Sequence, residues 1–432
     1  MSEAIQLFAG SRIKTSGVGL DAQLRALVAA TNPIETWDNE DFVAFLDAVS
    51  SQMISANSPV AGLIQEHDLG FIVAWLKKSS IQKMLAIQLE HPLQIQARKE
   101  RMTFHRPRGI AVHWIAGNVP VLGLLSLIQG LLSRNKNVVK APKSFGDVLV
   151  CLLNFIADVR VQNGEKTLLG SDLLGCLLTV YADRSDIESQ TLLSQAADVR
   201  IAWGGLEAVK TIAALPRKVN CRDIVFGPKV SFILMTEDAV TKLSAKEALT
   251  VADGIARDTF AFGQAGCNAP HNLILHGSPS SFEPFLEYLK VAMRSEAKRN
   301  EGVSYNPIDS YNVQERRFLY HVGGGKSVVE GDGFSYTLFV DRDHADIHDP
   351  IYCHSLFISY VDDLNQLASV IPENPQTVGL ACSEDRRYEI AEMLFNLGVL
   401  RVTQVGRMSL YTQPWDGYLP IQEMVKWVSL ET

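Results

Sequence analysis

The chain has 432 residues and a formal net charge of −8 at pH 7, and 47% of its residues are hydrophobic and 20% charged. This length allows two or three domains, each with its own core, and the composition is typical of a soluble globular protein. The basic residues are scattered among acidic ones, so the sequence lacks the basic patch expected of a nucleic-acid-binding protein.

The N-terminus and the longest apolar run predict neither export nor a membrane span. Residues 1–6 contain no basic region followed by an apolar stretch, so we expect no signal peptide. The longest apolar run, residues 119–132, contains Ser126 and Gln129, is too short to cross a bilayer and is predicted to form a buried helix. The six cysteines show no C-x-x-C spacing and form no disulfide framework, which favours a reducing, cytoplasmic location.

The first half of the chain predicts a helical region followed by an α/β series. Residues 20–105 carry apolar side chains at helical spacing and are predicted to form a helical cap. From Gly109 the pattern alternates: strands are predicted at residues 110–115, 137–140, 176–181, 199–202 and 230–235, and helices at 118–132 and 147–159. This alternation is typical of a parallel sheet with helices on both faces.

A second α/β series follows an amphipathic stretch at residues 247–260. Strands are predicted at residues 271–276, 335–340, 356–361 and 376–381, and helices at 281–293 and 386–397. We therefore expect an α/β protein with an N-terminal helical region and two α/β domains. The expected boundaries are 1–243 for the helices and first domain, 244–405 for the second domain and 406–432 for a C-terminal tail.

Cys267, at the junction of the two series, is the most informative residue. It ends the sequence Phe-Ala-Phe-Gly-Gln-Ala-Gly-Cys at 260–267, in which Gly263 and Gly266 permit φ > 0 and leave space beside the sulfur. A thiol in such a turn is a candidate nucleophile for covalent thioester chemistry, and interdomain junctions are favoured ligand sites. The alternative is a packing cysteine, because free cysteine is among the most buried residue types. We expect that packing role for the other five cysteines: Cys151, Cys176, Cys221, Cys353 and Cys382.

Several motifs that suggest other chemistry are incomplete. The Gly-Gly-Gly-Lys-Ser stretch at 323–327 lacks the first glycine of a P-loop, since residue 320 is tyrosine, and is predicted to be a surface loop. Neither a G-x-G-x-x-G after a strand nor a G-x-S-x-G occurs. Cys353 and His354 lack partners at metal-ligand spacing, so no metal site is expected. His113 lies inside an apolar strand. It is a weak candidate for a catalytic base and is more typical of a buried histidine whose ring nitrogens are hydrogen-bonded.

Three segments before Cys267 carry a family pattern. They are Gly-Ile-Ala-Val-His-Trp-Ile-Ala-Gly-Asn-Val-Pro at 109–120, Asn-Val-Val-Lys-Ala-Pro-Lys at 137–143 and Phe-Gly-Pro-Lys at 226–229. In order and spacing they resemble the aldehyde dehydrogenase superfamily. Together with Asp-Gly at 416–417 and Met-Val-Lys-Trp-Val at 424–428, they look most similar to the acyl-CoA reductase family of the bacterial luminescence fatty-acid reductase (LuxC-type). The resemblance covers roughly residues 100–430.

The resemblance implies a role for each matching residue. Cys267 is the nucleophile, and Asn118 supplies the side-chain half of an oxyanion hole together with the Cys267 backbone N–H. The alternative role for Asn118 is the N-cap of the helix that follows. Lys140 matches the lysine that contacts the adenosine ribose of the cofactor. The alternative role for Lys140 is a solvated charge at the end of a strand. Gly204 and Gly205 match the glycine turn where the cofactor diphosphate passes a helix N-terminus.

Three positions depart from the superfamily pattern. Aldehyde-oxidising members have a glutamate that activates the hydrolytic water; Val225 occupies its place, so a Cys267 thioester is expected to resist water. Lys143 stands where many NAD-using relatives have a glutamate that holds the ribose hydroxyls, and a cation there favours the 2′-phosphate of NADPH. Residues 351–355, Ile-Tyr-Cys-His-Ser, occupy the place of the Glu-x-Phe-Gly-Pro motif that holds the nicotinamide ribose.

The resemblance predicts an aldehyde dehydrogenase-like fold with a Rossmann-like NADP-binding domain and a catalytic domain. The expected activity is the NADPH-dependent reduction of a long-chain fatty acyl-CoA or acyl-protein thioester to a fatty aldehyde, through an acyl-Cys267 intermediate. The expected partners are the acyl-CoA or acyl-carrier thioester, an acyl-protein synthetase or transferase, and further copies of the chain in a homo-oligomer.

Three other functions are open. An aldehyde dehydrogenase that oxidises a free aldehyde would share the fold and the nucleophile. A non-catalytic subunit that organises a partner protein is a second alternative, against which the presence of both Asn118 and Cys267 argues. An acyltransferase that never binds nicotinamide is a third, against which Lys140, Lys143 and Gly204 argue.

Overall fold

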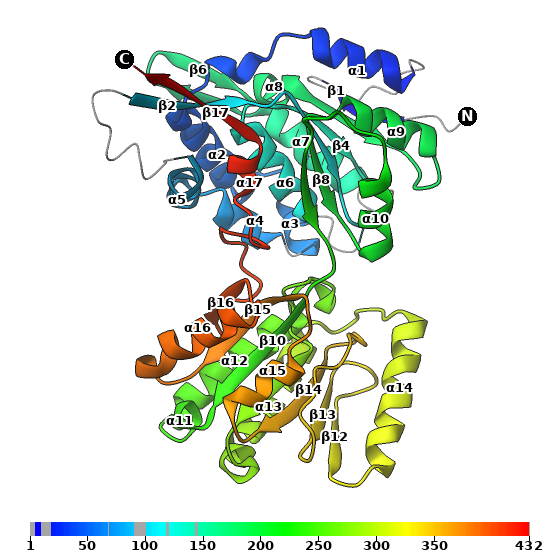
Figure 1. The fold of residues 1–432 in the computed structure, drawn as a ribbon, viewed down its shortest axis with the longest axis vertical. Coiled ribbons are helices and arrows are strands. Elements are labelled where there is room, and N and C mark those ends of the chain that lie inside the picture. Colours follow the sequence, from blue (N-terminus) through cyan, green and yellow to red (C-terminus); the bar gives the residue numbers. More distant parts are fainter. Residues whose placement is uncertain are drawn as a thin grey trace. The chain divides into compact units, whose positions relative to one another are not determined.

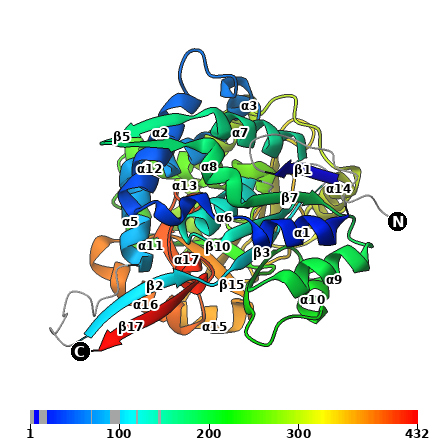
Figure 2. The same cartoon turned by 90° about the horizontal axis from the view of Figure 1, so that it is seen from above.

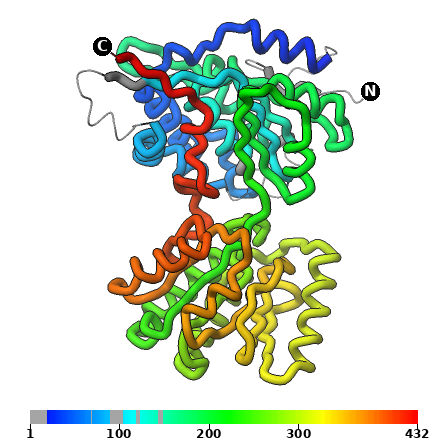
Figure 3. Tube along the Cα trace, viewed as in Figure 1, coloured from blue at the N-terminus to red at the C-terminus, as the bar shows by residue number. Residues whose placement is uncertain are grey.

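The computed structural model describes residues 5–9, 19–67, 69–89, 101–117, 121–142 and 146–431. Within it the chain forms two compact units. Unit 1 comprises Met1–Gly227 and Tyr411–Thr432, and unit 2 comprises Pro228–Leu410. Figure 3 traces the chain from unit 1 into unit 2 after residue 227 and back at residue 411, so unit 2 is inserted between two segments of unit 1.

The N-terminal helical region expected from the sequence is present in unit 1. It contains α1 (Leu20–Ala29), α2 (Asn39–Met53), α3 (Ala61–Glu66), α4 (Gly70–Trp75) and α5 (Lys78–Leu89). α2 begins at a capping box, in which the Asp38 and Asp41 side chains accept hydrogen bonds from each other's backbone N–H groups. Phe42, Phe45 and Leu46 on this helix are buried, as the helical spacing predicts.

The prediction of helix up to residue 105 is wrong at its end. β2 (Arg101–Pro107) pairs antiparallel with β17 (Val425–Glu431), which follows α17 (Pro420–Glu423) near the other end of the chain. Figure 2 shows β2 and β17 side by side. Strand formation at β2 thus depends on a partner far away in the sequence, and local apolar spacing carries no information about such a partner.

Unit 1 contains a six-stranded sheet in the order β1-β7-β4-β3-β8-β9, of which β1, β4 and β8 are labelled in Figure 1. The strands are β1 (Ile5–Ala9), β3 (Ile110–Trp114), β4 (Lys136–Lys140), β7 (Leu177–Tyr181), β8 (Val199–Trp203) and β9 (Arg222–Phe226). β1 is antiparallel to β7, and the other neighbours are parallel. The carboxyl ends of the parallel strands therefore meet at one edge, where Trp114 aligns with Lys140 and Ala202.

Helices cover both faces of this sheet, as the alternating pattern predicts. α1, α9 (Ile187–Ala196) and α10 (Leu206–Ala214) pack with Val112 on one face. α6 (Val121–Leu132) lies on the opposite face, where its Ser126 contacts His113, because successive strand residues point to opposite faces. Unit 1 also contains α7 (Gly146–Asp158), α8 (Gly170–Leu173) and the hairpin of β5 (Arg160–Asn163) and β6 (Lys166–Leu169).

The longest apolar run of the sequence forms α6. Its Leu124, Leu127 and Ile128 are buried in unit 1, which confirms the prediction of a buried helix. None of the described helices is long and apolar enough to cross a membrane.

Unit 2 contains a seven-stranded sheet in the order β12-β13-β14-β11-β10-β15-β16. The strands are β10 (Val230–Thr236), β11 (Asn272–His276), β12 (Lys326–Glu330), β13 (Thr337–Asp341), β14 (Ser355–Val361), β15 (Pro375–Ala381) and β16 (Arg401–Gln404). β12 is antiparallel to β13, and the other neighbours are parallel. α12 (Ala245–Phe260) and α13 (Pro279–Arg299) bury one face, and α15 (Leu367–Val370) and α16 (Arg387–Asn396) bury the other. α11 (Glu237–Val240) and α14 (Pro307–Val322) also belong to unit 2.

The division into units differs from the expected boundaries at residues 243 and 406. β10 pairs with β11 and β15, so it belongs to the sheet of unit 2 and not to the first domain. A fully buried parallel strand has the same sequence pattern in either sheet, so its apolar run does not reveal which sheet it joins. Residues after 411 return to unit 1 and supply β17, where a separate tail was expected.

The glycine-rich stretch at 323–327, expected to be a surface loop, ends in a strand. Gly325 takes a φ of 68° in the turn, and Lys326 and Ser327 begin β12. Lys326 lies directly opposite Asp341 on β13, and its Nζ is 2.9 Å from Asp341 Oδ2. The ion pair between these neighbouring strands therefore explains why a lysine occurs at position 326.

Candidate active site

Cys267 lies in a strained turn that follows α12 in unit 2. α12 begins at a capping box formed by Ser244 and Glu247 and leads into a 3-10 turn at Ala261–Gln264. Phe262 and Gln264 take left-handed backbone angles, with φ of 54° and 63°. Such angles cost a residue other than glycine about 1–3 kcal/mol, so the turn depends on the contacts around it.

The two glycines of this turn have different roles. Gly263 takes a φ of 60°, the left-handed conformation expected from the sequence. A Cβ atom at Gly266 would meet the Asn268 Oδ1 atom at 2.7 Å, so this glycine permits a close approach of a neighbouring side chain. Asn268 in turn donates its Nδ2–H to Met408 O at 2.8 Å.

Gln264 holds the turn from inside the protein. Its side chain is fully buried and accepts a hydrogen bond from Ser355 N at 3.1 Å. Its amide nitrogen donates to Ser355 O at 2.7 Å and to Pro270 O at 3.0 Å. These bonds join the Cys267 turn to the start of β14 and offset the backbone strain.

The Cys267 side chain is half-buried and contacts a neighbouring strand. Gln376, at the start of β15, donates its Nε2–H to Cys267 Sγ at 3.1 Å. Ser231 of β10 donates its hydroxyl proton to Cys267 O at 2.7 Å. Cys267 is therefore held in place and is only partly buried, as a nucleophile requires.

The other cysteines mostly pack in the core, as expected. Cys176, Cys221 and Cys353 are buried, and burial raises the pKa of each thiol, to about 12 for Cys176. Cys382 is half-buried against the core of unit 2, and burial also raises its pKa. The packing prediction is wrong for Cys151, because this residue lies on the exposed face of α7.

The segment in place of the Glu-x-Phe-Gly-Pro motif has an unusual backbone. Tyr352, Cys353 and His354 all take left-handed angles, with φ of 60°, 48° and 50°. The His354 ring stacks on Phe260 with centroids 3.8 Å apart, and its Nδ1–H donates to Ser335 O at 2.9 Å. This segment therefore supports the end of α12, and the sequence 351–355 supplies no carboxylate for a ribose.

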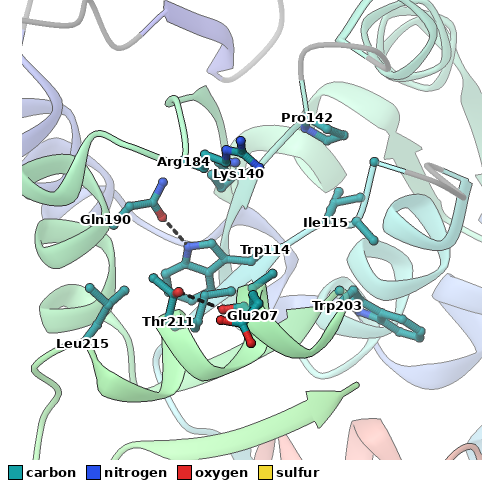
Figure 4. Close-up of a pocket in the computed structure, with 16 residues that line it drawn as sticks. Trp114, Ile115, Lys140, Pro142, Arg184, Gln190, Trp203, Glu207, Thr211 and Leu215 are labelled. Carbon is teal, nitrogen blue, oxygen red and sulfur yellow. Dashed lines mark hydrogen bonds between the residues drawn. The ribbon is translucent and has the colours of Figure 1, made fainter. Parts of the chain in front are cut away.

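Unit 1 contains a cavity of about 630 Å³ at the carboxyl edge of its parallel strands. Lys140, Gly204 and Gly205 all line it, and Figure 4 shows Lys140 among the labelled side chains of the lining. Ligands of open α/β sheets bind at this edge. The structure thus brings together three of the six site residues predicted from the sequence, while Asn118 and Lys143 lie outside the described residues.

The polar part of the cavity suits an anionic ligand. Lys140 is half-buried; burial lowers the pKa of its ammonium group, while Asp183 raises it. Arg184, an exposed residue after β7, adds a second cation to the lining. Gly205 is the N-cap of α10 and provides no side-chain cap, so the helix N-terminus can accept a phosphate. Glu207 in the first turn of α10 opposes this attraction and lies 3.8 Å from Lys210.

The apolar part of the cavity is built from fixed aromatic side chains. Trp114 donates its indole N–H to Gln190 Oε1 at 2.7 Å (Figure 4), and Gln190 donates to Asp183 O at 3.1 Å. Trp203 stacks on Phe226 with centroids 3.8 Å apart. Flat, immobilised walls of this kind suit a planar ring such as adenine.

Sequence reasoning missed Arg184, Gln190 and Gln376. Arg184 follows a predicted strand at the edge where Lys140 lies, so strand order would have suggested it. Gln376 reaches Cys267 through sheet pairing, for which the sequence carries no local signal.

His113 is a satisfied buried histidine, as the sequence favours. Its Nδ1 accepts a hydrogen bond from the Ser126 hydroxyl at 2.8 Å, and its Nε2–H donates to Asn137 Oδ1 at 3.0 Å. Burial lowers the pKa of His113 to about 4, so the ring is neutral near pH 7. In the described part of the chain, no three His, Cys, Asp or Glu residues are grouped so that they could hold a metal ion.

Solved structures of aldehyde dehydrogenases share this fold. Lactaldehyde dehydrogenase from Escherichia coli matches 100% of this chain and 96% of its own, with a TM-score of 0.65 and 14% identity. A 1-pyrroline-5-carboxylate dehydrogenase from Thermus with bound NAD matches 100% of this chain and 90% of its own, with a TM-score of 0.65 and 16% identity. The predicted aldehyde dehydrogenase-like fold is therefore confirmed.

Sequence comparisons identify the family. The long-chain acyl-protein thioester reductase of Aliivibrio fischeri is 24% identical over 332 residues, which cover 76% of this chain and 64% of that protein. The enzyme of the same name from Photobacterium phosphoreum is 24% identical over 330 residues, 75% of this chain and 63% of that protein. The chain thus spans less than two thirds of the length of these relatives. The family described as acyl-CoA reductase (LuxC) matches residues 26–427, and the chain belongs to this family.

Proposed function

We propose that the chain reduces an acyl thioester to an aldehyde through an acyl-Cys267 intermediate. The observation that carries this proposal is the half-buried Cys267, which lies in a strained turn and whose sulfur accepts a hydrogen bond from Gln376. Strained, tightly held turns are typical of catalytic sites. Family membership and the name of the relatives, long-chain acyl-protein thioester reductase, support the same activity.

The chemical role of Cys267 follows from its thiolate. The sulfur attacks the acyl carbonyl carbon, and the carrier thiolate leaves and takes up a proton, which leaves a thioester on Cys267. We propose that the Asn118 amide and the Cys267 backbone N–H stabilise the oxyanion of this step. Collapse of the reduced adduct then returns the electron pair to Cys267 Sγ and releases the aldehyde.

The cavity of unit 1 supports a nicotinamide cofactor, which supplies the hydride when bound. Two cations, a glycine turn at a helix N-terminus and fixed aromatic walls fit the adenosine and diphosphate parts of such a molecule. We propose NADPH, because Lys140 and Arg184 both line this cavity and a 2′-phosphate attracts cations. Lys143 is proposed as a further contact to that phosphate.

Val225 favours reduction over hydrolysis. It lies inside β9, partly buried against the core of unit 1, and offers neither a base nor a hydrogen bond. We propose that the acyl-enzyme therefore waits for hydride with little loss to water. A free aldehyde substrate, the main alternative, would require a group that activates water.

The remaining assignments follow from this chemistry. Unit 1 would bind the cofactor, and unit 2 would carry the nucleophile. We propose an acyl-CoA or an acyl-protein as donor, an acyl-protein synthetase or transferase as partner, and a homo-oligomer. The mechanism requires a reduced thiol, and thiols stay reduced in the cytoplasm. We therefore propose a cytoplasmic location.

Intact-protein mass spectrometry tests the proposal. Wild-type protein mixed with a long-chain acyl-CoA should gain one acyl group, and Cys267→Ala should gain none. Cys151→Ser, which removes the exposed cysteine of α7, is the matched control and should keep the adduct. NADPH should then release aldehyde from the wild-type adduct. An undiminished adduct on Cys267→Ala, or fatty acid in place of aldehyde, would contradict the proposal.

A further inference from the structure

An irregularity in the sheet of unit 2 brings Gln376 to the candidate nucleophile. β10 and β15 are parallel, but their register shifts between Val230 and Phe232, so that Ser231 opposes both Gln376 and Thr377. Bulges of this kind redirect a side chain and are common beside active sites. Here the redirected Gln376 is 2% exposed and donates its Nε2–H to Cys267 Sγ at 3.1 Å.

Ser231 fixes both partners of this contact. Its hydroxyl donates to Cys267 O at 2.7 Å and lies 3.3 Å from Gln376 Oε1. Its oxygen accepts a hydrogen bond from Thr377 N at 3.2 Å. The oxygen end of the glutamine amide therefore faces a hydroxyl group, and the nitrogen end faces the sulfur.

We propose that Gln376 is a further catalytic residue, which stabilises the Cys267 thiolate by this hydrogen bond and aims the sulfur at the acyl carbonyl. The inference deepens the proposed function and rests on it for the role of Cys267 in turnover. A hydrogen bond to a charged acceptor is stronger than one to a neutral acceptor, so the contact favours the thiolate over the thiol.

The proton balance is simple. A neutral amide does not take up the thiol proton, which passes to solvent before attack. The electron pair left on Sγ forms the bond to the acyl carbon, and the carrier thiolate leaves. Gln376 thus lowers the cost of forming the thiolate and does not act as a base.

Ionisable groups on the neighbouring elements include Asp258, Arg401 and His271. Asp258 of α12 accepts hydrogen bonds from Gly406 N at 2.5 Å and Met408 N at 3.0 Å, and burial raises its pKa to about 6. Arg401 of β16 donates to Met408 O at 2.9 Å. Burial lowers the pKa of His271, which follows the turn, to about 4. Burial lowers the pKa of Arg401 to about 10, so between pH 7 and 9 all three groups keep nearly constant charges and a titration in that range reports on the thiol.

The test measures the pH dependence of alkylation at Cys267 without any substrate. Iodoacetamide labelling is followed by peptide mass spectrometry, and the exposed Cys151 serves as an internal reference in each sample. Gln376→Met, which keeps the length and removes the donor, should raise the midpoint pH at Cys267 by about one unit. Gln376→Asn and Ser231→Ala should shift it in the same direction, whereas Gln366→Met at an exposed site should not.

The outcomes separate this inference from the proposed function. An unchanged midpoint in folded Gln376→Met overturns the role of Gln376, and if that variant does not fold, an unchanged midpoint in Gln376→Asn or Ser231→Ala does so. Either result leaves the acyl-Cys267 intermediate standing. If the midpoint shifts as expected but wild-type protein gains no acyl group, the proposed function fails and the thiolate contact stands.

Discussion

At the scale of single residues, Arg184 extends the proposed cofactor site beyond the sequence motifs. It lines the cavity with Lys140, and its exposed guanidinium is available to a phosphate. We predict that Arg184→Gln raises the KM for NADPH about tenfold and the KM for NADH less than twofold, because only NADPH has the 2′-phosphate.

Steady-state kinetics with both cofactors checks this prediction. Arg25→Gln, at an exposed arginine of α1 outside the lining of the cavity, is the matched control and should change neither constant. Equal increases for NADPH and NADH would assign Arg184 to a part shared by both cofactors, such as the diphosphate.

The sequence predicted part of the candidate site because some of its residues occur in local motifs. Lys140 ends a strand and Gly204 and Gly205 follow one, in recognisable patterns, and the structure places all three at one cavity. Their roles in cofactor binding stay predictions. Gln376 could not be predicted in this way, because its contact with Cys267 depends on the pairing of β10 with β15.

At the scale of secondary-structure elements, the turn between α12 and β11 is the segment that holds the proposed nucleophile, Cys267. Its strained residues are balanced by the buried amide of Gln264, which bonds to Ser355 and Pro270. We predict that Gln264→Leu lowers the free energy of unfolding by about 3 kcal/mol, because three buried backbone groups lose a partner. It should also slow acylation of Cys267 by more than tenfold, because the turn loses its support.

Urea denaturation and the rate of acyl adduct formation check the two parts of this prediction. Gln366→Leu, at an exposed glutamine, is the control and should change both quantities little. A destabilised variant with an unchanged acylation rate would show that Gln264 supports the fold of unit 2 without holding the nucleophile.

The sequence predicted most elements that have a strong local pattern. The strands β3, β4, β7, β8, β11 and β14 lie within a few residues of their predicted bounds, because each is a short apolar run between turns. The edge strands β2, β12 and β16 were missed, since their side chains are more polar and their strand state depends on pairing.

At the scale of the whole molecule, each unit contains a buried neutral histidine. His113 in unit 1 and His271 in unit 2 are both buried, and burial lowers the pKa of each to about 4. In the unfolded chain a histidine has a pKa of about 6.5. Each histidine therefore contributes stability that is present above pH 6.5 and is lost as the pH falls through 4.

The titration of Asp258 in unit 2 changes the stability with pH in the opposite direction. Burial raises its pKa to about 6, above its ordinary value of 3.8. Its contribution is fully present below the ordinary value and is lost as the pH rises through 6. Acidification from pH 7 to 5 should therefore lower the free energy of unfolding by about 2 kcal/mol for each histidine. The protonation of Asp258 should raise it by about 1 kcal/mol over the same range.

We predict that the protein is less stable at pH 5 than at pH 7 and that the two histidines contribute much of the difference. Equilibrium urea denaturation at both pH values would be compared for wild type, His113→Gln, His271→Gln and Asp258→Asn. Each histidine variant is expected to be less stable at pH 7 but to lose about 2 kcal/mol less than wild type on acidification, because glutamine does not titrate. Asp258→Asn is expected to lose about 1 kcal/mol more than wild type. If His113→Gln and wild type lose the same stability, His113 takes up a proton in the folded state and its hydrogen bonds to Ser126 and Asn137 rearrange without cost.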